Sequence, residues 1–216
     1  MKIARPFAAL TLLVLFTGCQ KTYYSAWEKL GYEKRDILVS RVEKARDDQQ
    51  AAKDQIKTTL QQFQEVTGFQ GGDLEAKYKK LDSAYQKAES RAADVHKRID
   101  AVESTAGAMF SEWKDELKQY KSEQLRATSQ QELDQTKARY NELITVMKQA
   151  AAKMDPVLAA FHDQVLFLKH SLNAQAIASL QGTAGKIESD VTALIKDMEA
   201  SIAEANEFIN AMNKKG

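Results

Sequence analysis

Residues 74–113 read LEAKYKKLDSAYQKAESRAADVHKRIDAVESTAGAMFSEW. Apolar or small residues recur here at steps that alternate between four and three: Leu74, Tyr78, Leu81, Tyr85, Ala88, Ala92, Val95, Ile99, Val102, Ala106, Met109 and Trp113. Such spacing keeps one apolar seam on a helix and is typical of helices that pack along their length. The seam slips by one residue at Leu117 and Tyr120. We therefore predict a long packed helix over residues 74–127.

Three further stretches carry seams of the same kind. Their members are Leu38, Val42, Ala45, Gln49, Ala52, Ile56, Leu60 and Phe63; then Leu133, Thr136, Tyr140, Leu143, Met147, Ala150, Met154, Leu158, Phe161, Val165, Leu168 and Leu172; then Ile187, Val191, Leu194, Met198, Ile202, Ala205, Ile209 and Met212. Gln49 makes one polar layer in the first of these seams. With no strand signal in the sequence, the pattern predicts an all-α protein, an elongated antiparallel bundle or coiled coil of four helices over about 24–67, 74–127, 129–181 and 185–212.

The turns are predicted from glycines and capping residues. Gly68 to Asp73 is rich in glycine, and Asp73 is a suitable N-cap for the helix that begins at Leu74. Ser129 followed by Glu132 has the spacing of a capping box, which places a turn at 127–130. Gly182-Thr183-Ala184-Gly185 is the third expected turn. Asp155-Pro156 resembles a cap and a first-turn proline, yet the seam passes through it, so we expect one helix with a kink.

Antiparallel folding of these helices sets an expected layout. The short fourth helix covers only half of the third, which leaves a four-helix half and a three-helix half. The run Val165-Leu166-Phe167-Leu168 is apolar on every side, so we expect neighbours all round it in the four-helix half. Residue 23 comes level with about residue 118. The open side of the three-helix half is the expected surface for a protein partner or for self-association.

The beginning of the chain has the order of an export signal. Lys2 and Arg5 precede an apolar run from Phe7 to Phe16, which is too short to span a bilayer as a stable helix. The run ends at Thr17-Gly18-Cys19, which resembles a bacterial lipobox with Phe16 in the place where leucine is usual. We predict a lipoprotein signal peptide over 1–18, cleavage before Cys19, and acylation of Cys19. The alternative is an ordinary signal peptide with an incidental cysteine.

Residues 19–216 are then a single helical coiled-coil domain. By resemblance to Gram-negative lipoproteins, Gln20 after the cysteine favours the outer membrane, with the body in the periplasm. Cys19 is the only cysteine, so an acylated chain has no thiol for a disulfide, for redox chemistry or for a metal. The expected layout puts this lipid anchor near the 127–130 turn.

Charge argues against nucleic acid as a partner. Removal of residues 1–18 takes two of the 31 basic residues, Lys2 and Arg5, and none of the 30 acidic ones, so the mature side chains carry a net charge of −1. A nucleic-acid-binding domain would show a basic excess. The acidic residues alternate with lysines and arginines, which is the pattern of a solvated coiled-coil flank rather than of a paired acid and base.

Other candidate sites give no chemistry. His96, His162 and His170 lack the partners three or four residues away that metal-binding helices supply, so we expect packed or surface histidines and no metal. Gly182-Thr183-Ala184-Gly185-Lys186 fails the phosphate-loop pattern because Ile187 replaces the required Ser or Thr, so no nucleotide is expected. No catalytic residue and no cofactor is predicted. The aromatic residues Tyr23, Tyr24, Trp27 and Tyr32 either lie at the membrane interface or cap the base of the bundle.

Three stretches resemble an uncharacterised bacterial family, domain of unknown function 2959. They are Glu33 to Val39 with Arg41-Val42-Glu43, Gly71 to Tyr78, and Val165 to Ala174. The resemblance covers residues 22–210. It implies a helical protein, no established activity and no functional residues.

Two functions agree with these expectations. The first is a non-enzymatic, lipid-anchored envelope protein that acts as a structural or protein-interaction rod, with membrane lipid bound through acylated Cys19 and a protein partner or a second copy bound by the body. The second is a carrier that holds an apolar small molecule between its helices near Phe161, Phe167 and Phe208.

Overall fold

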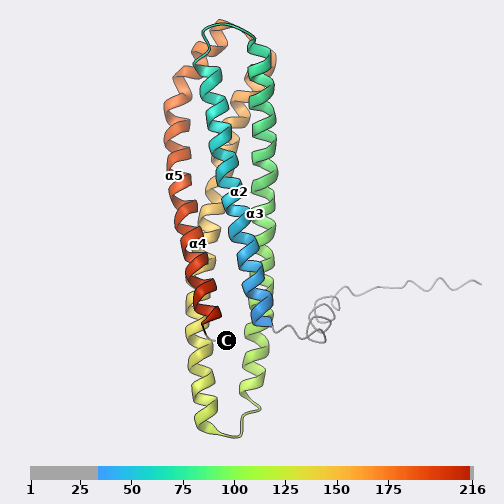
Figure 1. Cartoon of the computed structure of the whole chain (residues 1–216), viewed down its shortest axis with the longest axis vertical. Helices are drawn as coiled ribbons and strands as arrows, with labels where there is room; N and C mark the ends of the chain where they lie inside the picture. Colours follow the sequence, from blue (N-terminus) through green and yellow to red (C-terminus); the bar gives the residue numbers. More distant parts are fainter. Residues whose placement is uncertain (1–33, 215–216) are drawn as a thin grey trace, which may run out of the picture.

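The computed structural model describes residues 34–214, and these form four long helices without a strand. The helices are α2 (Lys34–Thr67), α3 (Leu74–Leu117), α4 (Glu123–His170) and α5 (Ala174–Asn213) (Figure 1). The prediction of an all-α antiparallel bundle is confirmed. The expected signal peptide, Cys19 and the aromatic residues Tyr23, Tyr24, Trp27 and Tyr32 lie outside the described residues.

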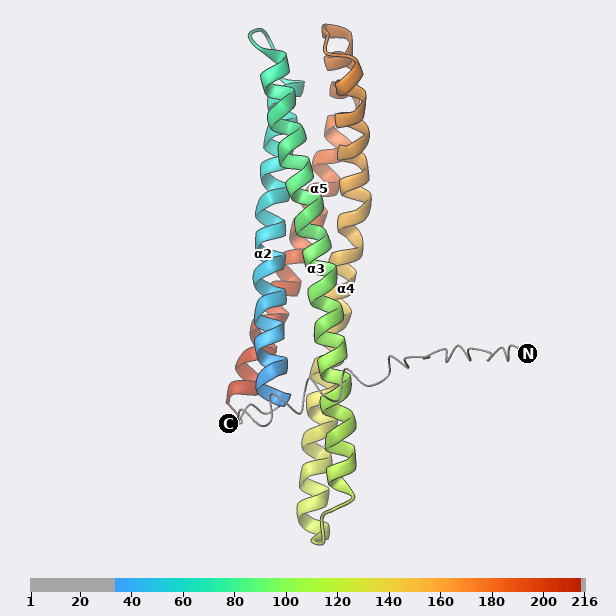
Figure 2. The same cartoon turned by 90° about the vertical axis from the view of Figure 1, so that its right-hand side faces the viewer.

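The helices form a ring in which each one packs on two others. α2 contacts α3 and α5, and α4 contacts α3 and α5. One end of the bundle carries the turns at 68–73 and 171–173, and we call it the turn end. At the other end, α3 and α4 continue past the first described residue of α2 and the last of α5 (Figure 2). We call this α3–α4 extension the projecting hairpin, and its end the hairpin end.

The seam residues form the core, as the spacing predicts. Leu38, Ile56, Leu81, Leu143 and Leu168 are fully buried, each on a different seam or a different level of one. Full burial of a side chain of this size stabilises the fold by about 1.5–3 kcal/mol.

The predicted polar layer at Gln49 is also present. The Oγ of Ser201 on α5 donates a hydrogen bond to the Oε1 of Gln49 on α2, at 3.0 Å, and both side chains are fully buried. Nearby, the Nζ of Lys53 lies 3.3 Å from a carboxylate oxygen of Glu199. These polar contacts fix α5 beside α2.

The turn that begins α3 is confirmed in detail. The Oδ1 of Asp73 accepts a hydrogen bond from the backbone N–H of Ala76 at 2.9 Å, which makes Asp73 the N-cap. Gly71 and Gly72 have φ of 149° and 104°, a region of backbone conformation that other residues rarely adopt. Glycine is therefore required by the geometry of this turn.

The predicted turn at 127–130 is wrong. α3 ends at Leu117, where the seam slips, and α4 begins after Ser122, whose Oγ accepts from the backbone N–H of Leu125 at 3.3 Å. The hydroxyl of Ser129 is not a cap. It lies inside α4 and accepts a hydrogen bond from the Nε1 of Trp113, at 2.9 Å, which ties the two helices of the projecting hairpin together.

The predicted turn at 182–185 is also wrong, since these residues lie inside α5. The chain turns at 171–173, and the Oδ1 of Asn173 caps α5 by accepting from the backbone N–H of Ala176 at 2.9 Å. Gly182 and Gly185 stand on the surface of the helix, where glycine is tolerated at a cost of about 1 kcal/mol each.

The longer α5 removes the predicted three-helix half. α5 has 40 residues and runs beside most of α2, with Asn206 accepting a hydrogen bond from Arg46 at 3.0 Å. The described bundle is therefore four-helical along α2, and only the projecting hairpin is thinner. α4 continues through Pro156 as one helix, as expected.

Candidate functional site

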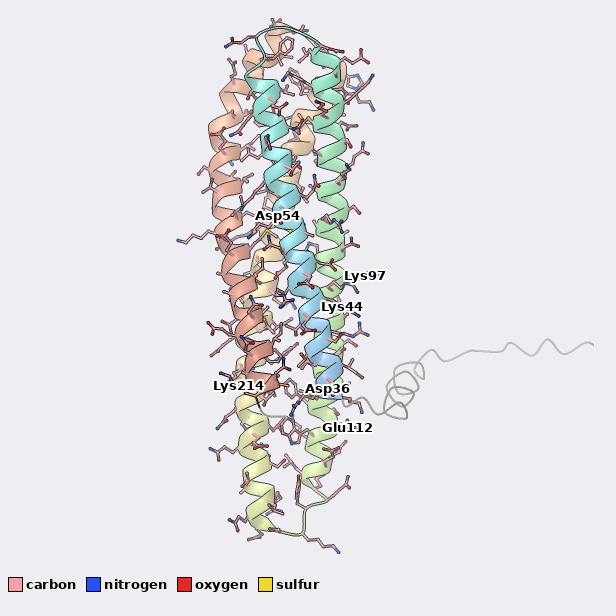
Figure 3. All side chains as sticks on the ribbon, in the orientation of Figure 1. Asp36, Lys44, Asp54, Lys97, Glu112 and Lys214 are labelled. Atoms are coloured by element: carbon pink, nitrogen blue, oxygen red, sulfur yellow. The ribbon has the colours of Figure 1, made fainter. Side chains whose placement is uncertain are left out.

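The one predicted site residue, Cys19, lies outside the described residues, so its acylation stays a prediction. The structure does place Lys34, the first described residue after it. Lys34 lies where the projecting hairpin begins, and its Nζ pairs there with Glu112 of α3 at 2.5 Å. Asp36 and Lys214 lie close to the level of Glu112, where the projecting hairpin begins (Figure 3). Both ends of the described chain therefore lie toward the hairpin end.

The hairpin end carries exposed apolar side chains among basic ones. Tyr120 is 41% exposed and Leu125 is 58% exposed. Beside them, a groove of about 840 Å³ runs between α3 and α4, and its lining residues are Ser111, Lys114, Asp115, Leu117, Lys118, Glu123, Arg126, Ala127 and Gln130. We call this groove together with Tyr120, Lys121 and Leu125 the hairpin tip.

Ion pairs neutralise only part of the positive charge of the hairpin tip. Lys118 pairs with Asp115 at 2.8 Å, and Arg126 lies 3.7 Å from Glu123. Lys114 and Lys121 are exposed and have no carboxylate partner within residues 34–214. The hairpin tip therefore combines net positive charge with accessible apolar surface.

The turn end carries the other exposed apolar residues. Leu166, Phe167 and Leu172 are 47%, 44% and 38% exposed, and we call them the distal patch. The prediction that the run 165–168 has neighbours all round is wrong. Only Val165 and Leu168 face the core, because α4 has two neighbours, α3 and α5, and its other sides meet solvent. The sequence already indicated that part of this run is exposed, because four consecutive residues of a helix cannot all lie on one face.

The histidines lie on the surface of the α3–α4 junction and at the end of α4. The Nε2 of His96 lies 3.3 Å from the Oδ1 of Asp155, and the ring of His162 lies 5.7 Å from that of Tyr85. His170 is the last residue of α4. Within residues 34–214, no group of three or more His, Cys, Asp or Glu is placed to hold a metal ion.

A groove beside these histidines is lined by several titratable side chains. It measures about 450 Å³ and includes Tyr85, Glu89, His96, Asp155 and His162 in its lining. Burial raises the pKa of the Tyr85 phenol well above its usual range, and Glu89 raises it further. A phenol with such a pKa holds its proton and is a poor base at neutral pH.

The phenylalanines proposed to hold an apolar ligand do not share one space. Phe161 and Phe208 lie in the core, whereas Phe167 belongs to the exposed distal patch. The ring of Phe161 packs edge-on against that of Phe63, with centroids 5.9 Å apart. The volume between the helices at this level is thus occupied by protein side chains.

Comparison with known proteins defines the family. A family model described as a protein of unknown function, DUF2959, matches residues 23–212, most of the chain. The chain belongs to the DUF2959 family. The match runs from the residues before α2 almost to the end of α5, so the DUF2959 model covers nearly all of the described bundle. No curated protein and no solved structure matches the chain.

A span across a membrane is not found in the described part of this DUF2959 protein. None of the helices α2 to α5 is long and apolar enough to cross a bilayer.

Proposed function

We propose that this DUF2959 protein is a non-enzymatic, lipid-anchored envelope protein that acts as a protein-interaction rod. Acylated Cys19 holds it in the bacterial outer membrane by the hairpin end. The body stands in the periplasm and presents the distal patch to a protein partner or to a second copy of the chain.

The distribution of exposed apolar residues carries this proposal. The five large apolar residues that are exposed within residues 34–214 all lie near the two ends of the bundle: Tyr120 and Leu125 at one end, and Leu166, Phe167 and Leu172 at the other. Exposed apolar groups that cluster on a surface mark contact sites more often than scattered ones do. The sides of the rod carry charged residues in surface ion pairs instead, such as Lys148 with Glu103.

The length of the rod suits an element that reaches between components. α4 joins the two ends, and its 48 residues extend over about 70 Å at 1.5 Å per residue. A partner on the distal patch would thus be held at a fixed distance from the anchored end.

Crosslinking in cells tests the contact at the distal patch. A photo-reactive amino acid at Phe167 should give a crosslinked product of higher mass, either with a partner or with a second copy. The matched control is Lys137, which is exposed on the same helix but far from the patch. The proposed contact is rejected if both positions give the same products or if neither gives any.

The anchor has its own test. Intact mass spectrometry of the native protein should show a chain that begins at Cys19 and carries a diacylglyceryl group with an added acyl chain. The variant Cys19→Ser should retain the signal segment and leave the membrane-bound lipoprotein fraction. A native chain cleaved elsewhere and without lipid would exclude the anchor.

A further inference from the structure

The hairpin tip unites three features. It has two exposed apolar side chains, two lysines without a carboxylate partner and a groove between the ends of two helices. Neither the packing of the core nor the distal patch accounts for it. From this combination we infer that the hairpin tip binds the surface of a membrane that contains anionic phospholipid.

The positive charge of the hairpin tip indicates an anionic ligand. Residues 114–126 carry four basic side chains, Lys114, Lys118, Lys121 and Arg126, and three acidic ones, Asp115, Glu116 and Glu123. Asp115 and Glu123 each pair with a basic residue of the tip, Lys118 and Arg126. The positive charges of Lys114 and Lys121 remain for phosphate groups. A basic residue close to an anionic bilayer strengthens binding by about fivefold.

The apolar side chains suit an interface rather than the bilayer interior. Tyr120 lies in the turn between α3 and α4, and an amphipathic tyrosine ring is favoured at the level of the headgroups. Leu125 follows in the first turn of α4 and is the most exposed of the large apolar residues described. Lys121, next to Tyr120, would extend toward phosphate while the ring enters the interface.

The position of the tip in the fold agrees with this contact. Lys34 pairs with Glu112, and α3 ends about 8 Å beyond Glu112 at 1.5 Å per residue. Residues 20–33 join Lys34 to Cys19 and span at most about 50 Å when fully extended. The described chain therefore begins on the side of the projecting hairpin, which agrees with an orientation in which the hairpin tip faces the bilayer. This orientation rests on the proposed anchor, whereas the affinity of the tip for lipid does not.

A vesicle assay with a chain that begins at Gln20 tests the tip without the anchor. This chain contains every described residue and no cysteine. It should co-sediment with vesicles of phosphatidylcholine and phosphatidylglycerol, bind vesicles of phosphatidylcholine alone far more weakly, and lose binding as salt is raised. No binding to the anionic vesicles, or equal binding to both kinds, would overturn the inference.

Paired variants locate the contact. Lys114→Gln with Lys121→Gln should weaken binding to anionic vesicles about 25-fold, from two basic residues at about fivefold each. The control, Lys80→Gln with Lys169→Gln, removes the same charge from exposed positions toward the turn end and should change binding by less than about twofold. Equal losses in the two variants would show a general charge effect and reject the site.

A single cysteine reports the orientation directly. Leu125→Cys, labelled with a polarity-sensitive fluorophore, should shift to the blue when anionic vesicles are added, whereas Leu172→Cys at the turn end should not. A shift at both positions or only at Leu172 would overturn the inference. Loss of acylation at Cys19 would reject the proposed anchor and leave these vesicle results unchanged, so the two proposals fail separately.

Discussion

Gln49 of α2 and Ser201 of α5 share a hydrogen bond of 3.0 Å, and both side chains are fully buried. The Nε2 of Gln49 is buried and has no hydrogen-bond partner. Substituting Ser201→Ala removes the hydroxyl and leaves a second buried polar group unpaired, so the free energy of unfolding should fall by about 1–3 kcal/mol. Urea unfolding of the chain that begins at Gln20 measures this.

The double variant is the control for that interpretation. Gln49→Leu with Ser201→Ala removes both polar partners, and its stability should equal or exceed that of the wild type. If the double variant were less stable than Ser201→Ala alone, the loss of stability would come from altered packing and not from the unpaired amide of Gln49. The lost polar layer should also make the pairing of α2 with α5 less selective.

Gly182 and Gly185 should weaken α5. A Cβ atom built on either glycine meets nothing within 4 Å. The substitutions Gly182→Ala and Gly185→Ala should each raise the free energy of unfolding by about 0.5–1 kcal/mol, because alanine loses less backbone entropy in a helix. The midpoint of urea unfolding measures the gain.

Gly72 provides the contrasting position. A Cβ atom there also meets nothing within 4 Å, but φ is 104°. Gly72→Ala should therefore lower stability by about 1–3 kcal/mol through backbone strain alone. If Gly72→Ala were as favourable as Gly182→Ala, the turn at 68–73 would differ from the structure described.

Pro156 interrupts the hydrogen bonds of α4 at an exposed position. Pro156→Ala should restore the backbone N–H and raise the free energy of unfolding by about 2–2.5 kcal/mol. That is the helix-interior penalty of proline, about 3 kcal/mol, less the entropy that proline removes from the unfolded chain. Thermal unfolding followed by circular dichroism would show a higher midpoint. A lower midpoint would mean that proline at this position is needed for α4 to pack.

Tyr140 should make stability depend on alkaline pH. Its ring packs against Phe110 with centroids 5.4 Å apart, and burial, with a further effect of Glu103, raises the pKa of its phenol to about 12. The unfolded chain releases this proton near pH 10, whereas the folded chain keeps it. The contribution of the protonated Tyr140 to the free energy of unfolding is therefore complete below pH 10 and is lost as the pH rises toward 12.

The variant Tyr140→Phe isolates this effect. Urea unfolding at several pH values should show that the wild type loses stability relative to Tyr140→Phe between pH 10 and 12, and not below pH 9. Equal loss in both proteins would assign the alkaline effect to other groups.

The sequence predicts the helices and their buried faces well, and it predicts two of the three turns poorly. Seam residues such as Leu81 and Ile99 are buried because a repeat of this length determines which side of a helix meets its neighbours. The turn at 68–73 was found because Gly71 and Gly72 adopt a backbone that few other residues allow. Ser122 and Asn173 were missed because serine and asparagine are common in sequence, and only the packing of the long helices selects which of them caps.

The candidate surfaces were harder to predict. Phe167 appears in the sequence as one of four apolar neighbours, and its exposure depends on how many helices surround α4. The two lysines of the hairpin tip, Lys114 and Lys121, resemble every other lysine of a charged helix. Only their place in the fold distinguishes them: they lie at the end of the projecting hairpin, where α2 and α5 no longer pack against α3 and α4.

The contact between α2 and α5 can form only after the whole bundle has been synthesised. α2 and α5 are the first and last helices described, and Arg46 meets Asn206 across 160 positions of sequence. During synthesis, the apolar flank of α2 that packs on α5 therefore stays exposed until α5 has been made. A nascent or C-terminally truncated form would expose that flank, which makes it a natural client for a chaperone that shields apolar surfaces.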